Sequence, residues 1–108
     1  MPTINTSKVY TQSDGAAVMN TPSYHEPVNQ VSFYSTCTTG TLLVEVKYHP
    51  KANWEIQTVA DDVTPLVIDL SAPKTFQLFD KWVYSFRFTP TGADGEYSPM
   101  LASGRMYD

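Results

Sequence analysis

In two segments of this chain an apolar face alternates with a mostly polar one, and this alternation restricts the folds that the chain can adopt. The segments are Thr41 to His49 and Lys81 to Thr89. One face of each segment consists of Leu42, Val44, Val46 and Tyr48 in the first and Trp82, Tyr84, Phe86 and Phe88 in the second. A period of two residues is typical of a β-strand with one face on a core and the other in water.

Shorter alternating segments lie at residues 31–37, 54–59 and 66–70, and turn-forming residues separate them. No segment carries an apolar stripe at helical spacing. Seven or so strands at intervals of roughly ten residues predict an all-β chain, an antiparallel β-sandwich of Ig-like or jelly-roll-like type. Cys37 shares a face with Val31 and Phe33, so we expect it to be a buried small apolar residue. Pro99 would confine the last strand to a sheet edge.

The first 27 residues differ from the remainder because they are rich in Thr, Ser, Asn and Pro and contain few large aliphatic residues. Pro22 and Pro27 exclude a helix through this region. We therefore expect residues 1–27 to form an extended N-terminal arm with one or two short strands and a turn at 13–15. The β-sandwich domain would then span residues 28–108, and the arm would dock on its own domain or on a neighbour.

Length and charge exclude several classes of protein. The 108 residues are typical of one domain. The net charge is −4, and no Lys/Arg cluster supplies the positive surface that a nucleic-acid partner requires. The apolar runs are too short to span a membrane, and we expect no signal peptide at the N-terminus. With Cys37 as the single cysteine, no intrachain disulfide can form, which favours a reducing cytosol or indifference to redox state.

The sequence offers few residues for catalysis or metal binding. His25 and His49 lack a third ligand at metal-site spacing, and the acidic loops at 61–62 and 94–96 lack the spacing of a calcium loop. No nucleophile elbow, phosphate loop or dinucleotide fingerprint is present. We therefore expect no catalytic, cofactor-binding or metal site, and a non-enzymatic protein. An enzyme with a site assembled across strands is the lowest-ranked alternative.

The aromatic residues divide into core and surface candidates. Trp54, Phe86 and Phe88 are expected in the core. Tyrosines in the arm, in the tail or on outward strand faces favour protein contacts. The predicted partner-binding residues are Val9, Tyr10, Val18, Met19, Tyr24, Tyr34, Tyr97 and Tyr107.

Residues 40–92 resemble the small β-sandwich virion proteins of tailed bacteriophages, which serve as head decoration or accessory head and tail proteins. The matching elements are Gly40-Thr41 at the start of an alternating strand, Asn53-Trp54 after a short polar turn, and Arg87-Phe88-Thr89-Pro90 before a Gly turn. The resemblance implies a capsid decoration or stabilising protein, assembled in the host cytoplasm and located on the virion. It further implies contacts with the major capsid protein or other virion proteins, and a homo-oligomer, with a trimer favoured.

Two other functions stay open. One is a carbohydrate-binding β-sandwich for host attachment, with Trp54 or Trp82 as a stacking platform. The other is an accessory protein of the tail or neck. In a virion protein the polar, Pro-containing arm would be suited to add a strand to a neighbour's sheet edge.

Overall fold

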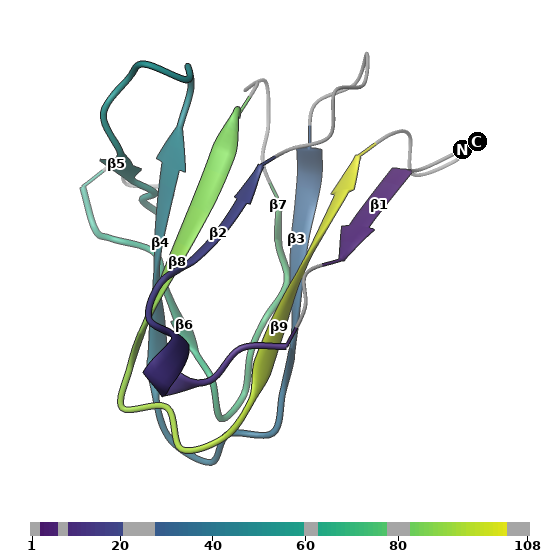
Figure 1. Ribbon diagram of the computed structural model, residues 1–108, viewed down its shortest axis with the longest axis vertical. Coiled ribbons are helices and arrows are strands. Elements are labelled where there is room, and N and C mark those ends of the chain that lie inside the picture. The colour runs from purple at the N-terminus through teal and green to yellow at the C-terminus, as the bar shows by residue number, and fades with distance from the viewer. Residues whose placement is uncertain (1–2, 7–8, 21–27, 60–62, 78–82, 104–108) are drawn as a thin grey trace.

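The computed structural model describes residues 3–6, 9–20, 28–59, 63–77 and 83–103, and the regular structure in these residues is mostly β-strand, with one short 3-10 helix (Figure 1). The strands form two antiparallel sheets. Sheet I contains, in order, β1 (Thr3–Thr6), β9 (Tyr97–Ser103), β3 (Val28–Ser35) and β7 (Phe76–Gln77). Sheet II contains β2 (Ala17–Asn20), β8 (Ser85–Thr91) and β4 (Thr41–Lys47), with β5 (Glu55–Ile56) and β6 (Val67–Asp69) along the outer edge of β4. The predicted all-β, antiparallel architecture is confirmed.

The chain is organised as one long hairpin whose two halves run antiparallel. β1 pairs with β9, β2 with β8, β3 with β7, and β4 with both β5 and β6. Two further pairings, β3 with β9 and β4 with β8, fold this hairpin into the two sheets. In the described residues, every strand pair therefore joins a strand of the first half to a strand of the second half.

The core lies where the inward faces of the two sheets meet. Leu42, Val44 and Val46 alternate inward along β4, and Phe86 and Phe88 do so along β8. The buried apolar residues are Ala17, Met19, Val31, Cys37, Leu42, Val44, Val46, Ile68, Leu70, Val83, Phe86, Phe88, Tyr97 and Leu101. The expected burial of Cys37, Phe86 and Phe88 is confirmed. Burial of this apolar surface is the main stabilising contribution to the fold.

The core also links the sheets through aromatic contacts. The ring of Phe33 on β3 meets that of Phe88 on β8 edge-to-face, at 5.6 Å between centroids. Phe33 also contacts Phe76 on β7, with centroids 6.1 Å apart. Edge-to-face pairs add to the stabilisation that burial alone provides. Tyr84 is exposed and does not share the buried face of Phe86, because β8 begins only at Ser85. Trp82 lies outside the described residues.

The last strand is interior to sheet I, so the prediction that Pro99 confines it to an edge is wrong. β9 pairs with β1 on one side and with β3 on the other. Tyr97 exchanges backbone hydrogen bonds with Tyr10, on the β1 side of β9. Residues two apart in a strand point their backbone groups the same way, so the nitrogen of Pro99 also faces that side. Because this nitrogen does not face β3, the proline removes no hydrogen bond from the pairing with β3. The described β1 ladder ends at Met100, one residue away from the proline.

The two strands at the edge of β4 form one strand interrupted by a loop. The N–H of Gln57 donates to the carbonyl of Val44 at 2.9 Å, directly after β5. The N–H of Leu66 then donates to the carbonyl of Gln57 at 2.7 Å, just before β6. Thr58 and Pro65 form an isolated bridge that closes the loop between them. The pairing along the edge of β4 is therefore nearly continuous from β5 to β6.

The segment before residue 28 contains two strands that pair with the remainder of the chain. β1 pairs with β9, and β2 pairs with β8, where Ala17 and Met19 enter the core. Between them, the 3-10 helix η1 (Gln12–Asp14) lies where the expected turn was placed. The side chain of Gln12 bonds to the backbone of Pro90 and Ala93, at 3.0 Å and 2.9 Å. The division of the chain into an arm and a domain at residue 27 stays a prediction.

Two neighbouring loops at the η1 end of the molecule are joined through one carboxylate. The N–H groups of Thr38 and Thr39 donate to Asp94 at 2.8 Å and 3.1 Å, and the hydroxyl of Thr38 also donates to it. These hydrogen bonds, the Thr38 hydroxyl first, lower the pKa of Asp94. Gly40 is required here because its φ is +114° and a Cβ would lie 2.7 Å from the Cα of Ala93.

The assignment of faces along β4 predicts unequal effects from two adjacent leucines. Leu42→Ala is expected to lower the free energy of unfolding by about 2–5 kcal/mol, because it removes a fully buried side chain from the core. Leu43→Ala, the matched control on the outer face, is expected to cost less than about 1 kcal/mol. Urea unfolding followed by circular dichroism measures both values. Equal losses would contradict the assignment of faces.

The hydrogen bonds to Asp94 predict a pH-dependent contribution to stability. Because the folded pKa lies below the usual 3.8, the contribution is present above that pH and is lost as the pH falls through the folded pKa. Asp94→Ala is therefore expected to lower the urea midpoint at about pH 7 and to have a smaller effect at about pH 2. Thr38→Val, which removes one donor, should give a smaller loss of the same sign. A loss from Asp94→Ala that is the same at both pH values would refute this explanation.

Candidate interaction surface

The outer face of sheet II carries a row of side chains in direct register. Val18 on β2 lies opposite Arg87 on β8, Arg87 lies opposite Glu45 on β4, and Glu45 lies opposite Ile56 on β5. Directly opposed residues in antiparallel strands point to the same face, so all four side chains project outward. The alternation that buries the neighbouring core residues thus also aligns two charges between two apolar side chains.

The two charged residues of this row form a bidentate ion pair. Nε of Arg87 donates to Oε1 of Glu45 at 3.0 Å, and Nη2 donates to Oε2 at 2.8 Å. Their side chains are 31% and 15% exposed, so water screens the pair only in part. Two parallel N–H···O bonds fix the plane of the guanidinium group. The fixed plane makes Arg87 a rigid element of an otherwise solvated sheet face.

Trp54 stacks on this ion pair. Cζ of Arg87 lies 4.6 Å from the centroid of the Trp54 ring, and Nζ of Lys47 lies 5.0 Å from it. Cations over an aromatic face are attracted by its quadrupole. The expectation that Trp54 belongs to the core is wrong, because β5 is an edge strand and the ring folds over the outer face instead. Trp54 is half-buried there.

Apolar side chains surround the ion pair and remain open to solvent. Val18 is 52% exposed, Ile56 is 49% exposed and Val67 is 50% exposed. Leu43 lies opposite Val67 on the same face and is half-buried. We name the set of outward side chains the Trp54 surface. It consists of Val18, Leu43, Glu45, Trp54, Ile56, Val67 and Arg87.

This combination of residues is typical of a protein-contact surface. Trp and Arg are enriched among the residues that dominate binding energy, and aliphatic side chains supply apolar area around them. A guanidinium already paired with a carboxylate is partly desolvated before a partner arrives, which lowers the cost of covering it. The Trp54 surface is therefore the strongest candidate for a site at which another protein binds.

The predicted partner-binding residues occupy several different environments. Val18 belongs to the Trp54 surface, and Val9 is exposed beside the Tyr10–Tyr97 bridge. Tyr34 is exposed on the outer face of sheet I, on the opposite side of the molecule. Met19 and Tyr97 are buried in the chain's own core. Tyr24 and Tyr107 lie outside the described residues.

Tyr10 and Tyr97 contact each other within the chain. Their rings stack with centroids 5.8 Å apart, and their backbones exchange hydrogen bonds of 2.8 Å and 2.9 Å. Burial raises the pKa of Tyr97 to about 12, with smaller contributions from Tyr10, Asp14 and Cys37. The phenol of Tyr97 therefore stays neutral at physiological pH. The pair ties the segment between β1 and η1 to β9.

Sequence reasoning missed Arg87, Ile56 and Val67 as surface candidates. The sequence pattern places the charges at positions 45 and 87 on the solvated faces of two strands, but nothing local shows that these strands are neighbours. The available signal was the placement of an acidic and a basic residue on two strongly alternating strands, since opposite charges often pair across a sheet. The position of Trp54 depends on the edge location of β5, which the sequence pattern does not indicate.

The ion pair predicts a measurable coupling between Glu45 and Arg87. In a double-mutant cycle of Glu45→Ala and Arg87→Ala, we expect a coupling free energy of about 0.5–1 kcal/mol, because both side chains are partly solvated. The free energies of unfolding in urea give this value. Arg87→Ala combined with Tyr34→Ala, on opposite faces of the molecule, is the control and should be additive. A coupling near zero for the first pair would show that the bidentate contact does not stabilise the fold.

The described parts of the chain contain no candidate metal site and no candidate membrane-spanning helix. Within them, no three His, Cys, Asp or Glu side chains are grouped so that they could hold a metal ion, and no helix is long and apolar enough to cross a membrane. His49 accepts the N–H of Lys51 at 3.0 Å within a turn, and His25 lies outside the described residues. Comparison with protein-family models, curated proteins and solved structures finds no match for this chain.

Proposed function

We propose that this chain is a non-enzymatic structural protein of a bacteriophage virion that decorates or stabilises the capsid by binding other virion proteins. The observation that carries the proposal is the Trp54 surface, where a stacked Trp and Arg lie among exposed aliphatic side chains. Such a surface suits burial against a protein partner more than contact with solvent. The resemblance of residues 40–92 to small phage virion proteins supports the same function.

The finer fold that we propose is a β-sandwich of the jelly-roll type. Counting β5 and β6 as one interrupted strand turns the nine described strands into eight. Four antiparallel pairs then run from the outermost, β1 with β9, to the innermost, β4 with β5 and β6. A long hairpin rolled into two four-stranded sheets is the pattern of a jelly roll, a fold that recurs in viral capsid proteins. This fold-level likeness supports the proposal by analogy only.

The proposed partners are the major capsid protein and further copies of this chain. The Trp54 surface would face the shell or a neighbouring copy, and a trimer at a local symmetry point remains the favoured assembly. The edge strands β2 and β5 of sheet II are only four and two residues long, which protects the sheet against uncontrolled edge-to-edge pairing. The virion, assembled in the host cytoplasm, is the proposed location.

The position of Trp54 bears on the carbohydrate-binding alternative. A sugar ring stacks on a free aromatic face, whereas the guanidinium of Arg87 and the ammonium of Lys47 both approach the ring of Trp54. This arrangement favours a protein partner over a glycan. An accessory role in the tail or neck would use the same surface on a different virion protein.

The introduction of negative charges at the apolar rim of the Trp54 surface tests the proposed function. Ile56→Glu with Val67→Glu is expected to reduce binding to capsids of the encoding phage by at least about tenfold, because two carboxylates would be desolvated in the contact. Cosedimentation with capsids measures binding, and light scattering after size exclusion measures self-association. Circular dichroism should show an unchanged fold.

Ser32→Glu, on the outer face of sheet I, is the matched control and should bind capsids as the unmodified chain does. Capsid binding and self-association that both survive the double substitution would overturn the proposed role of the Trp54 surface. Binding of the unmodified chain to a glycan array, without binding to capsids, would favour carbohydrate recognition instead.

A further inference from the structure

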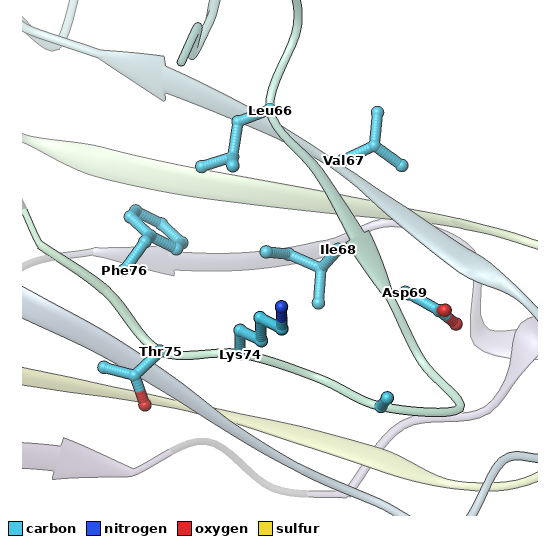
Figure 2. A pocket seen from close by; sticks show the side chains of 8 residues that line it. Leu66, Val67, Ile68, Asp69, Lys74, Thr75 and Phe76 are labelled. Carbon is cyan, nitrogen blue, oxygen red and sulfur yellow. The ribbon is translucent and has the colours of Figure 1, made fainter. Parts of the chain in front are cut away.

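A second candidate site lies between two edge strands, one from each sheet. A cavity of about 480 Å³ separates β6, at the edge of sheet II, from β7, at the edge of sheet I (Figure 2). We name it the β6–β7 cleft. Its lining residues are Leu66, Val67, Ile68, Asp69, Ala72, Lys74, Thr75 and Phe76. A volume of this size is within the range of sites that bind small ligands or peptide side chains.

The walls of the cleft are apolar. Figure 2 shows Leu66 and Ile68 pointing from β6 into the space between the strands, and Phe76 pointing into it from β7. Phe76 rests on Phe33, so the core supports the floor of the cleft and holds it in shape. Val67 lies at the rim of the cleft but points toward the outer face, so the cleft adjoins the Trp54 surface along β6.

One cation faces these apolar walls. The side chain of Lys74 reaches into the space between β6 and the segment that leads to β7. The nearby carboxylate of Asp69 is engaged by Ser71, whose N–H and hydroxyl donate to it at 3.0 Å and 2.7 Å. These bonds lower the pKa of Asp69. Among the described residues, Lys74 has no ion-pair partner, so its ammonium group is available to an anionic group of a ligand.

The shape of the cleft selects an extended chain that ends inside it. β6 and β7 are three and two residues long, and in the described residues each pairs with a strand on one side only. The turn at Ser71–Pro73 connects the two strands and closes one end of the cleft, near Lys74. An extended peptide that enters from the Leu66 end therefore meets the turn, where a chain terminus fits and a continuing chain does not.

We propose that the β6–β7 cleft binds the C-terminus of a partner polypeptide, with an apolar side chain between Leu66, Ile68 and Phe76 and the terminal carboxylate at Lys74. Backbone groups of the exposed strand edges are available to hydrogen-bond the extended ligand, as in other cases of strand addition. The charge of Lys74 distinguishes a terminal carboxylate from a neutral chain end. The proposal does not rest on the Trp54 surface or on the proposed virion function, although Val67 borders both sites.

A titration of the full chain with two short peptides tests the site. The probes are acetyl-Ala-Leu-Phe with a free C-terminal carboxylate and the same peptide as its C-terminal amide. Two-dimensional ¹H–¹⁵N NMR spectra should show the largest shifts at the amides of residues 66–69 and 74–76. The free acid is expected to bind about two- to fivefold more tightly than the amide at low salt, and added salt should reduce this difference.

Lys74→Met is expected to abolish the difference between the two peptides, and because Lys74 is exposed the variant should fold normally. Lys51→Met, an exposed lysine in the turn after β4, is the matched control and should leave the difference intact. Shifts confined to other parts of the molecule, equal binding of acid and amide, or an unchanged difference in Lys74→Met would each overturn the proposal.

Discussion

The packing of β4 and β8 on the inner face of sheet II is the constraint on which the remainder of the structure depends. Three aliphatic side chains of β4 and two phenylalanines of β8 point into the same core, and Phe33 of sheet I meets Phe88 edge-on. A one-residue slip of either strand would turn the inward side chains of that strand toward solvent. The register of sheet II is therefore fixed by burial, and the same register determines which side chains lie opposite each other on the outer face.

The arrangement of side chains on the outer face follows from this register. Glu45 and Arg87 face each other because their neighbours Val44 and Phe88 must both be inside. Trp54 then has a flat guanidinium to stack on, and the short β5 leaves the ring free to fold over it. A surface suited to protein contact thus arises with charged side chains interspersed among the aliphatic ones.

Local alternation was enough to predict which side chains of β4 and β8 enter the core, because period-two patterns report faces directly. It was not enough to place Trp54 or Pro99. Trp54 leaves the core because its strand lies at a sheet edge. Pro99 is tolerated inside a sheet because its nitrogen faces the N-terminal segment, at a position between Met100 and Tyr97, which are the residues paired with that segment. The β6–β7 cleft was equally hidden, since it depends on two short strands from different sheets ending side by side. All three features depend on neighbours distant in sequence.

The pairing of first-half strands only with second-half strands has a consequence for synthesis on the ribosome. While residues up to Lys47 emerge, none of the described strands among them has a pairing partner yet available. Hydrogen-bonded structure can first grow when β5 and β6 return along β4, and the last pair to close joins Thr3 to Ser103. Such distant closures are slow, so the nascent chain passes through a long interval with unpaired strand edges. The first 27 residues contain few strongly apolar side chains, and this limits association of the nascent chain with other chains during that interval.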